Sequence, residues 1–168
     1  LDPASNRIYV TDQSGVLTVL DATDYTVLAT LPVGGELTLD PLHPRLYVAP
    51  GLRVFGKSSA IQIIDTTTLT ISATISDATH LSLDPEHGRI FVGHALLPLF
   101  PPNPPIGGLR VLDAVTLATL AEAALDGIPV YNPRRDELLL ITDSLLRIDP
   151  VSLELRQDLF PAITVQPC

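Results

Sequence analysis

The sequence has no methionine or tryptophan and only one cysteine, which is its last residue. A single cysteine excludes an internal disulfide framework and a zinc site made of several cysteines. No run of apolar residues reaches the ~18 that a membrane-spanning helix requires. The chain also lacks a Gly-x-Ser-x-Gly nucleophile elbow, a P-loop and a dinucleotide-binding fingerprint. We therefore expect no membrane span, and no motif assigns a catalytic residue.

Positive charge is also scarce. The 10 Lys and Arg residues are outnumbered by 19 Asp and Glu residues, which gives a net charge of −9. Proteins that hold nucleic acid through its phosphates carry the opposite balance. We therefore expect no nucleic-acid partner. Hydrophobic residues make up 46% of the 168 positions, which suffices for a packed core in one domain or a short array of repeats.

An internal repeat organises the chain. The string LDPASNRIYV at 1–10 returns as LDPLHPRLYV at 39–48 and as LDPEHGRIFV at 83–92, with a diverged copy, YNPRRDELLL, at 131–140. A second motif follows each copy. Its aspartates are Asp21, Asp65, Asp113 and Asp149.

Each repeat has one segment of fixed length and one of variable length. The step from Asp21 to Asp40 is 19 residues, and the two later steps of this kind, from Asp65 to Asp84 and from Asp113 to Asn132, are also 19. From the first motif to the second, the steps are 19, 25, 29 and 17 residues. A single loop therefore absorbs the insertions, as loops on one face of a repeat array do.

The motifs are typical of β-strands joined by tight turns. RIYV, RLYV and RIFV contain β-branched and aromatic residues. LTVLD from Leu17 and IQIID from Ile61 alternate apolar with polar residues. Asp-Pro and Asp-x-x-Thr or Asp-x-x-Ser are turn sequences. One repeat thus predicts four antiparallel strands, named A to D, with strand A before the Asp-Pro turn. Four strands in roughly 40 to 50 residues is the length of a propeller blade.

One segment favours a helix when it is considered alone. TLATLAEAAL at 116–125 has Leu117, Leu120, Ala121 and Ala124 at helical spacing. The same place in the first two repeats is DYTVLATL and TLTISATI, which are rich in strand-forming residues. The repeat therefore predicts a strand in this segment.

These motifs resemble those of the YVTN-repeat β-propeller family, within the broader superfamily of quinoprotein amine dehydrogenase-like propellers. The resemblance rests on Asp2-Pro3 and on residues 7–10, 17–21 and 27–34. The fourth repeat departs from the pattern at Asn132, Glu137 and Arg147. The resemblance implies an all-β β-propeller with four four-stranded antiparallel blades, serving as an extracytoplasmic binding module, a scaffold or an enzyme subunit.

We expect a single repeat domain over residues 1–168, with repeats of about 1–38, 39–82, 83–130 and 131–168. AITVQP at 162–167 aligns with ELTLDP at 36–41, so it predicts a last strand A that completes the first blade and brings the total to 16 strands. The blades would be part of a larger ring, half of an eight-bladed ring of two chains, or a closed four-bladed ring. Because the chain begins with Leu1 and contains no Met, we expect a processed product or a piece of a longer protein.

Candidate binding residues lie on the loops that join strand B to C and strand D to A, where propellers usually bind ligands. The longest loops are 49–60 and 94–108, and the second is dense in proline, which favours a stiff, extended backbone. We interpret them as rigid surface flaps or as contacts for a protein or small-molecule partner. The candidates are Asp12, Glu36, Arg53, Phe55, His80, His94, Phe100, Asp126 and Asp143.

His80 and His94 flank strands A and B of one blade at the same end and are a candidate metal pair. The alternative is a pair of solvated or backbone-bonded imidazoles, because no spaced third ligand is evident. No cofactor is predicted. His43 and His87 lie in Asp-Pro turns, so their repetition indicates turn chemistry.

Other repeated residues have structural interpretations. Three arginines each follow a turn aspartate by five residues, and we interpret the pairs as hairpin salt bridges: Asp2–Arg7, Asp40–Arg45 and Asp84–Arg89. Four aromatic residues recur with the repeat and are predicted core residues: Tyr9, Tyr47, Phe91 and Tyr131.

Three hypotheses for function follow. The favoured one is a non-enzymatic binding or scaffold module of a bacterium or archaeon, periplasmic or secreted, which presents its loops to a protein or small ligand. It would act alone, as a homodimer or with further blades. The second is an enzyme or enzyme subunit, similar to a quinoprotein dehydrogenase heavy chain or a propeller lactonase, with a site at the ring mouth. The third is a set of structural repeats in a longer surface protein.

Overall fold

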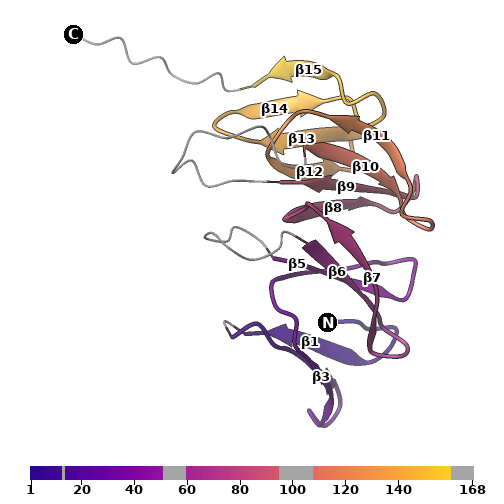
Figure 1. The fold of residues 1–168 in the computed structure, drawn as a ribbon. Helices are drawn as coiled ribbons and strands as arrows, with labels where there is room; N and C mark the ends of the chain where they lie inside the picture. The colour runs from indigo at the N-terminus through magenta and orange to yellow at the C-terminus, as the bar shows by residue number, and fades with distance from the viewer. Residues whose placement is uncertain (13, 51–59, 95–107, 160–168) are drawn as a thin grey trace. The chain divides into compact units, whose positions relative to one another are not determined.

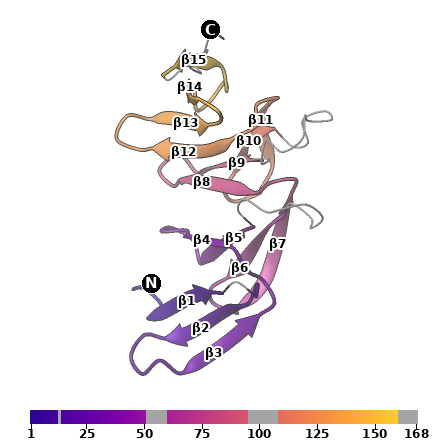
Figure 2. The ribbon, with the colours of Figure 1, turned by 90° about the vertical axis from the view of Figure 1, so that its left-hand side faces the viewer.

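A computed structural model describes residues 1–12, 14–50, 60–94 and 108–159, which form only β-strands, turns and loops (Figures 1 and 2). The first sheet contains β1 (Arg7–Thr11), β2 (Leu17–Asp21) and β3 (Val27–Leu31). The second contains β4 (Glu36–Leu39), β5 (Arg45–Ala49), β6 (Ala60–Asp65) and β7 (Thr70–Ser76). The third contains β8 (His80–Asp84), β9 (Arg89–Gly93), β10 (Leu109–Asp113) and β11 (Thr119–Ala123). The fourth contains β12 (Ile128–Asn132), β13 (Glu137–Ile141), β14 (Leu145–Ile148) and β15 (Leu155–Asp158). Among these described residues, no helix is long and apolar enough to cross a membrane.

Every sheet is an antiparallel meander in which sequence neighbours pair. The predicted four-stranded repeat is confirmed in the second, third and fourth sheets. The first sheet has three strands within the described residues, and its expected fourth strand, 162–167, lies outside them. In each sheet, the turns that contain the two repeated motifs lie at one end, here named the turn end. The B-to-C and D-to-A connections lie at the other, the loop end.

The chain divides into two compact units, Leu1–Thr79 and His80–Cys168. Unit 1 contains the first and second sheets, and unit 2 contains the third and fourth. The expectation of one domain over 1–168 remains a prediction.

The turns between strands C and D share one hydrogen-bond pattern. In the second sheet, the backbone N–H groups of Thr67 and Thr68 both donate to Asp65 Oδ1 at 2.8 Å. The fourth residue after the aspartate has a left-handed φ between 57° and 62° in all four turns. These four residues are Tyr25, Leu69, Leu117 and Leu153. The same turn therefore forms in every sheet, whatever residue occupies the left-handed position.

This turn explains why the helical spacing at 116–125 is misleading. The left-handed φ of 61° at Leu117 is incompatible with a continuous α-helix. The strand predicted by the repeat is confirmed, because Thr119–Ala123 forms β11 and pairs with β10.

Each unit has an apolar core between its two sheets. In unit 1, Tyr9 and Val19 of the first sheet pack with Leu46 and Ile64 of the second. In unit 2, the rings of Phe91 and Tyr131 stack with centroids 5.3 Å apart. All four predicted aromatic core residues are at most 9% exposed, as expected from their recurrence.

An arginine joins the two sheets of unit 2 at the turn end. Arg89 Nε donates to Asp84 Oδ2 at 2.7 Å within the third sheet. Its Nη1 and Nη2 donate to Pro150 O at 3.3 Å and to Asp136 Oδ1 at 3.2 Å in the fourth sheet. The guanidinium also lies 5.6 Å from the centroid of the Phe91 ring, within cation–π range. We name this bridge from one sheet to the next the arginine latch.

Unit 1 has a simpler latch. Arg7 Nη1 donates to the carbonyl oxygen of Thr66, the residue after the turn aspartate of the second sheet. Pro150 holds the same turn position in the fourth sheet. The latch therefore runs, in both units, from strand B of the earlier sheet to the C-to-D turn of the later one.

The three expected hairpin salt bridges have different outcomes. Arg89 Nη2 lies 2.5 Å from Asp84 Oδ2, so that pair is in direct contact. The Asp2–Arg7 side-chain pair is not formed within the described residues, because Arg7 reaches Thr66 and Asp2 Oδ1 accepts the Ala4 N–H at 3.0 Å. Two backbone hydrogen bonds, at 2.8 and 3.1 Å, join Asp2 and Arg7 instead.

Asp40, the carboxylate of the expected Asp40–Arg45 pair, also caps its own turn. Its Oδ1 accepts the Leu42 N–H at 2.8 Å, and its Oδ2 lies 3.0 Å from His43 Nδ1. His87 Nδ1 lies 3.0 Å from Asp84 in the same way. Both histidines therefore belong to turn chemistry, as the repeat indicated.

Two of the residues at which the fourth repeat departs from the pattern, Glu137 and Arg147, carry opposite charges and lie next to each other. Glu137 occupies the latch position of β13, and its side chain is only 7% exposed. Arg147 Nε, on the adjacent β14, lies 3.2 Å from Glu137 Oε2, and Asn132 Nδ2 donates to Oε1 at 3.1 Å. The equivalent β2 and β10 positions hold Val19 and Val111. The buried carboxylate is thus neutralised within its own sheet.

We predict that Arg89→Met lowers the free energy of unfolding by about 3 kcal/mol, because it leaves the fully buried Asp84 carboxylate without its cation. Urea unfolding of the chain followed by circular dichroism measures this loss. Arg135→Met is the control, since Arg135 is 73% exposed and 3.9 Å from its carboxylate, and it should cost under about 0.5 kcal/mol. Equal losses in both variants would contradict a structural role for the latch.

We predict that Arg147→Val, which restores the residue type of the other repeats, destabilises the chain by about 1–2 kcal/mol, because Glu137 stays buried without its main cation. Adding Glu137→Gln should recover most of that loss. A valine variant as stable as the parent chain would show that the pair does not compensate.

Stability should also fall in acid. Backbone hydrogen bonds from Ser152 and Val151 lower the pKa of Asp149 from 3.8 to about 2. A carboxylate with a lowered folded-state pKa stabilises the fold above its unfolded pKa and loses that contribution as the pH falls through the folded value. We predict that Asp149→Asn is less stable by about 1 kcal/mol at pH 6 and that the difference shrinks between pH 4 and 2. A difference independent of pH, in urea unfolding at several pH values, would contradict this.

Candidate functional site

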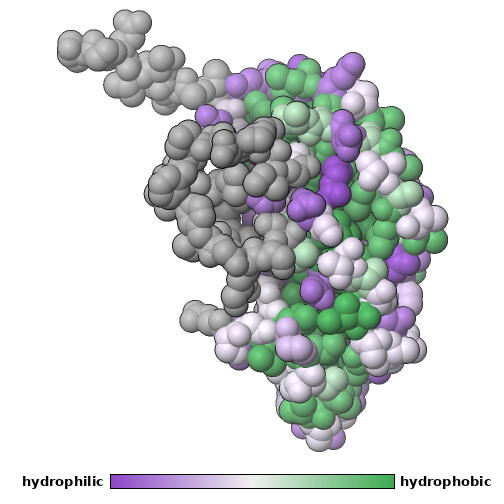
Figure 3. Space-filling model, in the orientation of Figure 1, coloured by the Kyte–Doolittle hydropathy of each residue, from purple (hydrophilic) through white to green (hydrophobic). Residues whose placement is uncertain are grey.

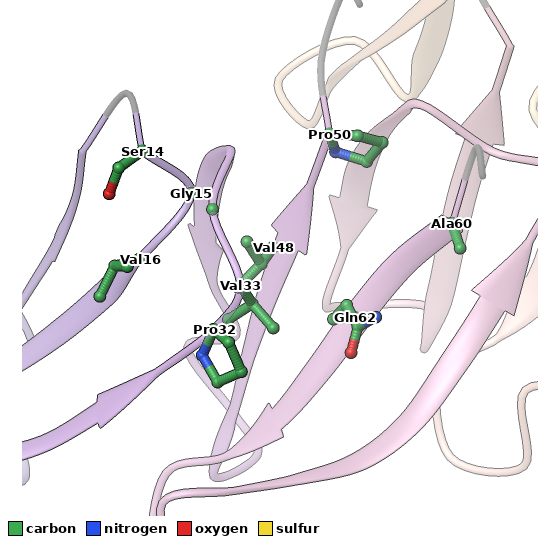
Figure 4. Close-up of a pocket in the computed structure, with 10 residues that line it drawn as sticks. Ser14, Gly15, Val16, Pro32, Val33, Val48, Pro50, Ala60 and Gln62 are labelled. Carbon is green, nitrogen blue, oxygen red and sulfur yellow. The ribbon is translucent and has the colours of Figure 1, made fainter. Parts of the chain in front are cut away.

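Surface hydropathy does not single out a docking patch on the face drawn in Figure 3, where apolar and polar residues of the described chain are interspersed. A pocket is more informative. Unit 1 contains one of about 360 Å³ at the loop end of the first and second sheets. Its lining residues come from three connections and from β5 and β6 (Figure 4). They are Ser14, Gly15, Val16, Pro32, Val33, Gly34, Val48, Pro50, Ala60 and Gln62.

Asp12 shapes one wall of this pocket. Its Oδ1 accepts the Ser14 hydroxyl at 2.7 Å and the Val16 N–H at 3.0 Å, which closes the turn after β1. The bond from Ser14, followed by that from Val16, lowers the pKa of Asp12. Its carboxylate is therefore a turn cap that stays ionised, beside the pocket and engaged with two lining residues.

Two glycines allow the pocket walls to approach each other. Gly15 has a φ of 86°, which favours glycine. A Cβ on Gly34 would lie 2.4 Å from the Gly15 Cα, so a side chain at residue 34 would push the two connections apart. The contact between these connections therefore depends on the absence of a side chain at residue 34.

The pocket has polar and apolar surface in similar measure. Val33 and Val48 are 7% and 1% exposed, and Pro32, Pro50 and Ala60 extend the apolar part. Gln62 contributes a carboxamide, and Ser14 contributes a hydroxyl. Among the residues that the structure describes, none that lines the pocket is ionisable. A cavity of this size that combines apolar surface with uncharged polar groups suits a small ligand or a short piece of peptide.

The pocket only partly matches the sequence candidates. Asp12 adjoins it as a turn cap, and exposed Glu36 opens β4 just after Gly34 and Gly35. Three candidates lie outside the described residues: Arg53, Phe55 and Phe100. Sequence reasoning missed Gln62 as a site residue. The available signal was a polar residue in β6 between Ile61 and Ile63, which the strand alternation assigned simply to the second face.

Four candidates lie at the loop end of unit 2. His80 and His94 are both 3% exposed, and His80 pairs with Gly93 in the β8–β9 register. The Gly127 N–H donates to the His94 carbonyl oxygen at 3.1 Å, which places the connection that holds Asp126 beside His94. Asp143 is exposed and accepts the Thr142 hydroxyl at 3.1 Å. The sequence prediction that both histidines lie at one end agrees with this register, while a metal between them remains a prediction.

Within the described residues, one group of three potential metal ligands has atoms within 4.8 Å of one another, and it lies at the turn end of unit 2. It consists of Asp84, His87 and Asp136. The Arg89 guanidinium contacts both carboxylates of this group. A metal cation there would have to displace a guanidinium that already supplies the positive charge. We therefore assign this cluster to the arginine latch.

Hydrogen bonds in the latch cluster determine which of its side chains are ionised. The Tyr131 hydroxyl donates to Asp136 Oδ1 at 2.8 Å, and this bond, with the nearby Arg89, lowers the pKa of Asp136. Burial and the same hydrogen bond raise the pKa of Tyr131. The tyrosine therefore stays neutral and the aspartate charged around neutral pH, which suits a structural bridge.

No protein-family model matches the chain, and no curated protein matches it. Several solved structures do. Dihydro-heme d1 dehydrogenase NirN is 18% identical with a TM-score of 0.63, over 95% of this chain and 35% of that chain. BamB from Moraxella catarrhalis is 13% identical with a TM-score of 0.60, over 91% and 45%. Kuenenia stuttgartiensis hydrazine synthase is 16% identical with a TM-score of 0.67, over 94% and 47%.

These likenesses concern the fold. The chain spans less than half of each of these three chains. Two of the three are named as enzymes, a dehydrogenase and a synthase, and at such low identity no activity transfers. The YVTN-repeat family remains a prediction. The four antiparallel sheets and these structural likenesses together establish that the chain has the β-propeller fold.

Proposed function

We propose that this chain is a non-enzymatic β-propeller module that binds a partner at the loop end of its sheets, with the unit 1 pocket as its binding site. The observation that carries the proposal is a pocket of about 360 Å³ built by loop-end connections, whose described lining residues are uncharged. A scaffold that presents loops on rigid sheets is a common way to build a binding site.

The two ends of the sheets differ in what their polar groups do. At the turn end, Asp65 and Asp149 cap turns and Arg89 bridges two sheets, so these charges are engaged within the fold. At the loop end of unit 1, the lining residues are uncharged and Gln62 presents a carboxamide to the pocket. Length variation between repeats is also concentrated in the B-to-C connections of that end. This division supports a binding role for the loop end.

A second candidate is an enzyme or enzyme subunit with its site at the loop end of unit 2. Two nearly buried imidazoles, His80 and His94, close to the connection that contains Asp126, favour it. This candidate requires that Zn²⁺ or another divalent ion binds and that His80→Ala and His94→Ala abolish that binding. Titration of the metal-free chain with Zn²⁺ by calorimetry tests it directly.

The cellular location of the protein and the extent of its binding role are also proposed. We place the protein outside the cytoplasm, on the resemblance to YVTN-repeat propellers. Because the chain spans less than half of the similar structures, the partner is proposed for these four sheets and not for a whole larger protein.

We predict that small fragments bind the loop end of unit 1 and that Ala60→Phe, which fills the pocket from β6, blocks them. The probes are N-acetyl-prolinamide, n-butylamine and butyrate, each titrated at millimolar concentration into ¹⁵N-labelled chain and followed by amide chemical shifts. At least one should shift resonances of pocket residues in the parent chain, with at least a tenfold weaker response in Ala60→Phe.

Thr67→Phe is the matched control, because it adds the same side chain to an exposed position at the turn end of the same sheet. It should leave binding unchanged. Thermal unfolding by circular dichroism checks that both variants fold. If the shifts persist in Ala60→Phe, or if neither these probes nor longer peptide amides shift pocket resonances, the pocket is not the binding site.

A further inference from the structure

We propose that the unit 1 pocket takes an extended, uncharged peptide segment. In this arrangement Gln62 pairs with the main-chain N–H and C=O of one residue of the segment, and the apolar part of the pocket holds a proline or aliphatic side chain. The inference rests on the proposed function and names the ligand class of the same site.

Gln62 is the first reason. It lies in β6, where it pairs with Val48 of β5 and Thr74 of β7, and it lines the pocket together with Pro32, Val33 and Val48 (Figure 4). Within the described residues its carboxamide makes no side-chain hydrogen bond. The equivalent positions in the other sheets hold Thr18, Arg110 and Leu146. Among these residues, only glutamine offers an uncharged donor and acceptor together at the end of a flexible side chain.

The chemistry of that carboxamide matches a peptide group. It has an N–H donor and a carbonyl acceptor, and each residue of an extended chain presents its own N–H and C=O on the same side. A ligand with only one of these functions would leave a donor or acceptor of Gln62 unpaired, which weakens binding. Pairing by two hydrogen bonds therefore favours an extended peptide residue over an ether or a hydrocarbon.

The apolar wall is the second reason. Val48 is 1% exposed and Val33 7%, so these two side chains are packed into the wall and leave most of the accessible apolar surface to other lining residues. Pro32 and Pro50 stand on two different connections and offer flat, preorganised ring surfaces (Figure 4). A proline or valine side chain fits such a wall without a large loss of conformational entropy, because both have few rotamers. The volume of about 360 Å³ suits a short segment of chain better than a folded domain.

Charge is the third reason. Among the described residues, none that lines the pocket is ionisable. The Asp12 carboxylate is bonded to Ser14 and Val16 of the wall, and Glu36 lies two residues after Gly34. A ligand carboxylate would therefore meet negative charge from this described part of the site. An uncharged segment avoids this penalty, so free amino acids and acidic peptides are disfavoured.

The test is a titration of the full chain with N-acetyl-valyl-prolyl-valinamide, followed by ¹⁵N chemical shifts. The same peptide with a free carboxylate and the single-residue N-acetyl-prolinamide serve as comparison ligands. We expect the tripeptide amide to bind at least fivefold more tightly than either. Gln62→Leu, which keeps the approximate volume but removes both hydrogen-bonding groups, should weaken its binding about tenfold. Gln157→Leu, an exposed glutamine of β15 in unit 2, should leave the affinity unchanged.

The outcomes separate the two proposals. If n-butylamine or butyrate binds the pocket while the tripeptide amide does not, the binding role stands and the peptide inference is overturned. The same conclusion follows if the tripeptide binds equally well to the parent chain and to Gln62→Leu, with both variants folded by circular dichroism. If N-acetyl-prolinamide binds as tightly as the tripeptide, the ligand is a small amide and the extended-segment part is wrong. If no ligand of any class binds, the proposed function itself fails.

Discussion

The interaction on which each unit depends is an arginine side chain that reaches from one sheet to the next. Arg89 neutralises the fully buried Asp84 of its own sheet and donates to Pro150 and Asp136 of the next. Stacked β-sheets are otherwise held by apolar contact, which is strong but weakly directional. A planar donor fork adds a preferred register at the rim of the apolar core. The stacking of Phe91 on Tyr131 lies beside this bridge, so polar and apolar contacts select the same alignment.

The residues that stabilise the fold and the residues proposed to bind a partner lie at opposite ends of the strands. The turn end contains the caps, the latches and the compensating Glu137–Arg147 pair, and a substitution there acts on folding. The loop end of unit 1 contains glycine contacts and an uncharged pocket, where a residue such as Gln62 is not engaged with other side chains of the described chain. Loops at that end can therefore change without disturbing the bonds that align the sheets.

Local features were predictable from the sequence, and contacts between sheets were not. The strands and the Asp turns follow from residue type and period, and the repeat corrected the helical spacing around Leu117. The Arg7 side chain was expected to pair with Asp2, and in the structure it donates to the carbonyl oxygen of Thr66, 59 residues away. The pocket could not be predicted either. Its walls meet through Gly15 and Gly34, and backbone contact between distant connections leaves no periodic signal in the sequence.

Glu137 stands where the other three repeats have an arginine, and this difference determines what a sheet offers to a neighbour. Arg7 and Arg89 reach a main-chain oxygen in the C-to-D turn of the next sheet, so the side chains of that turn matter little. The fourth sheet instead carries a carboxylate that its own Arg147 and Asn132 neutralise. A sheet packed against the fourth would therefore have to be held by apolar contact or by a donor of its own.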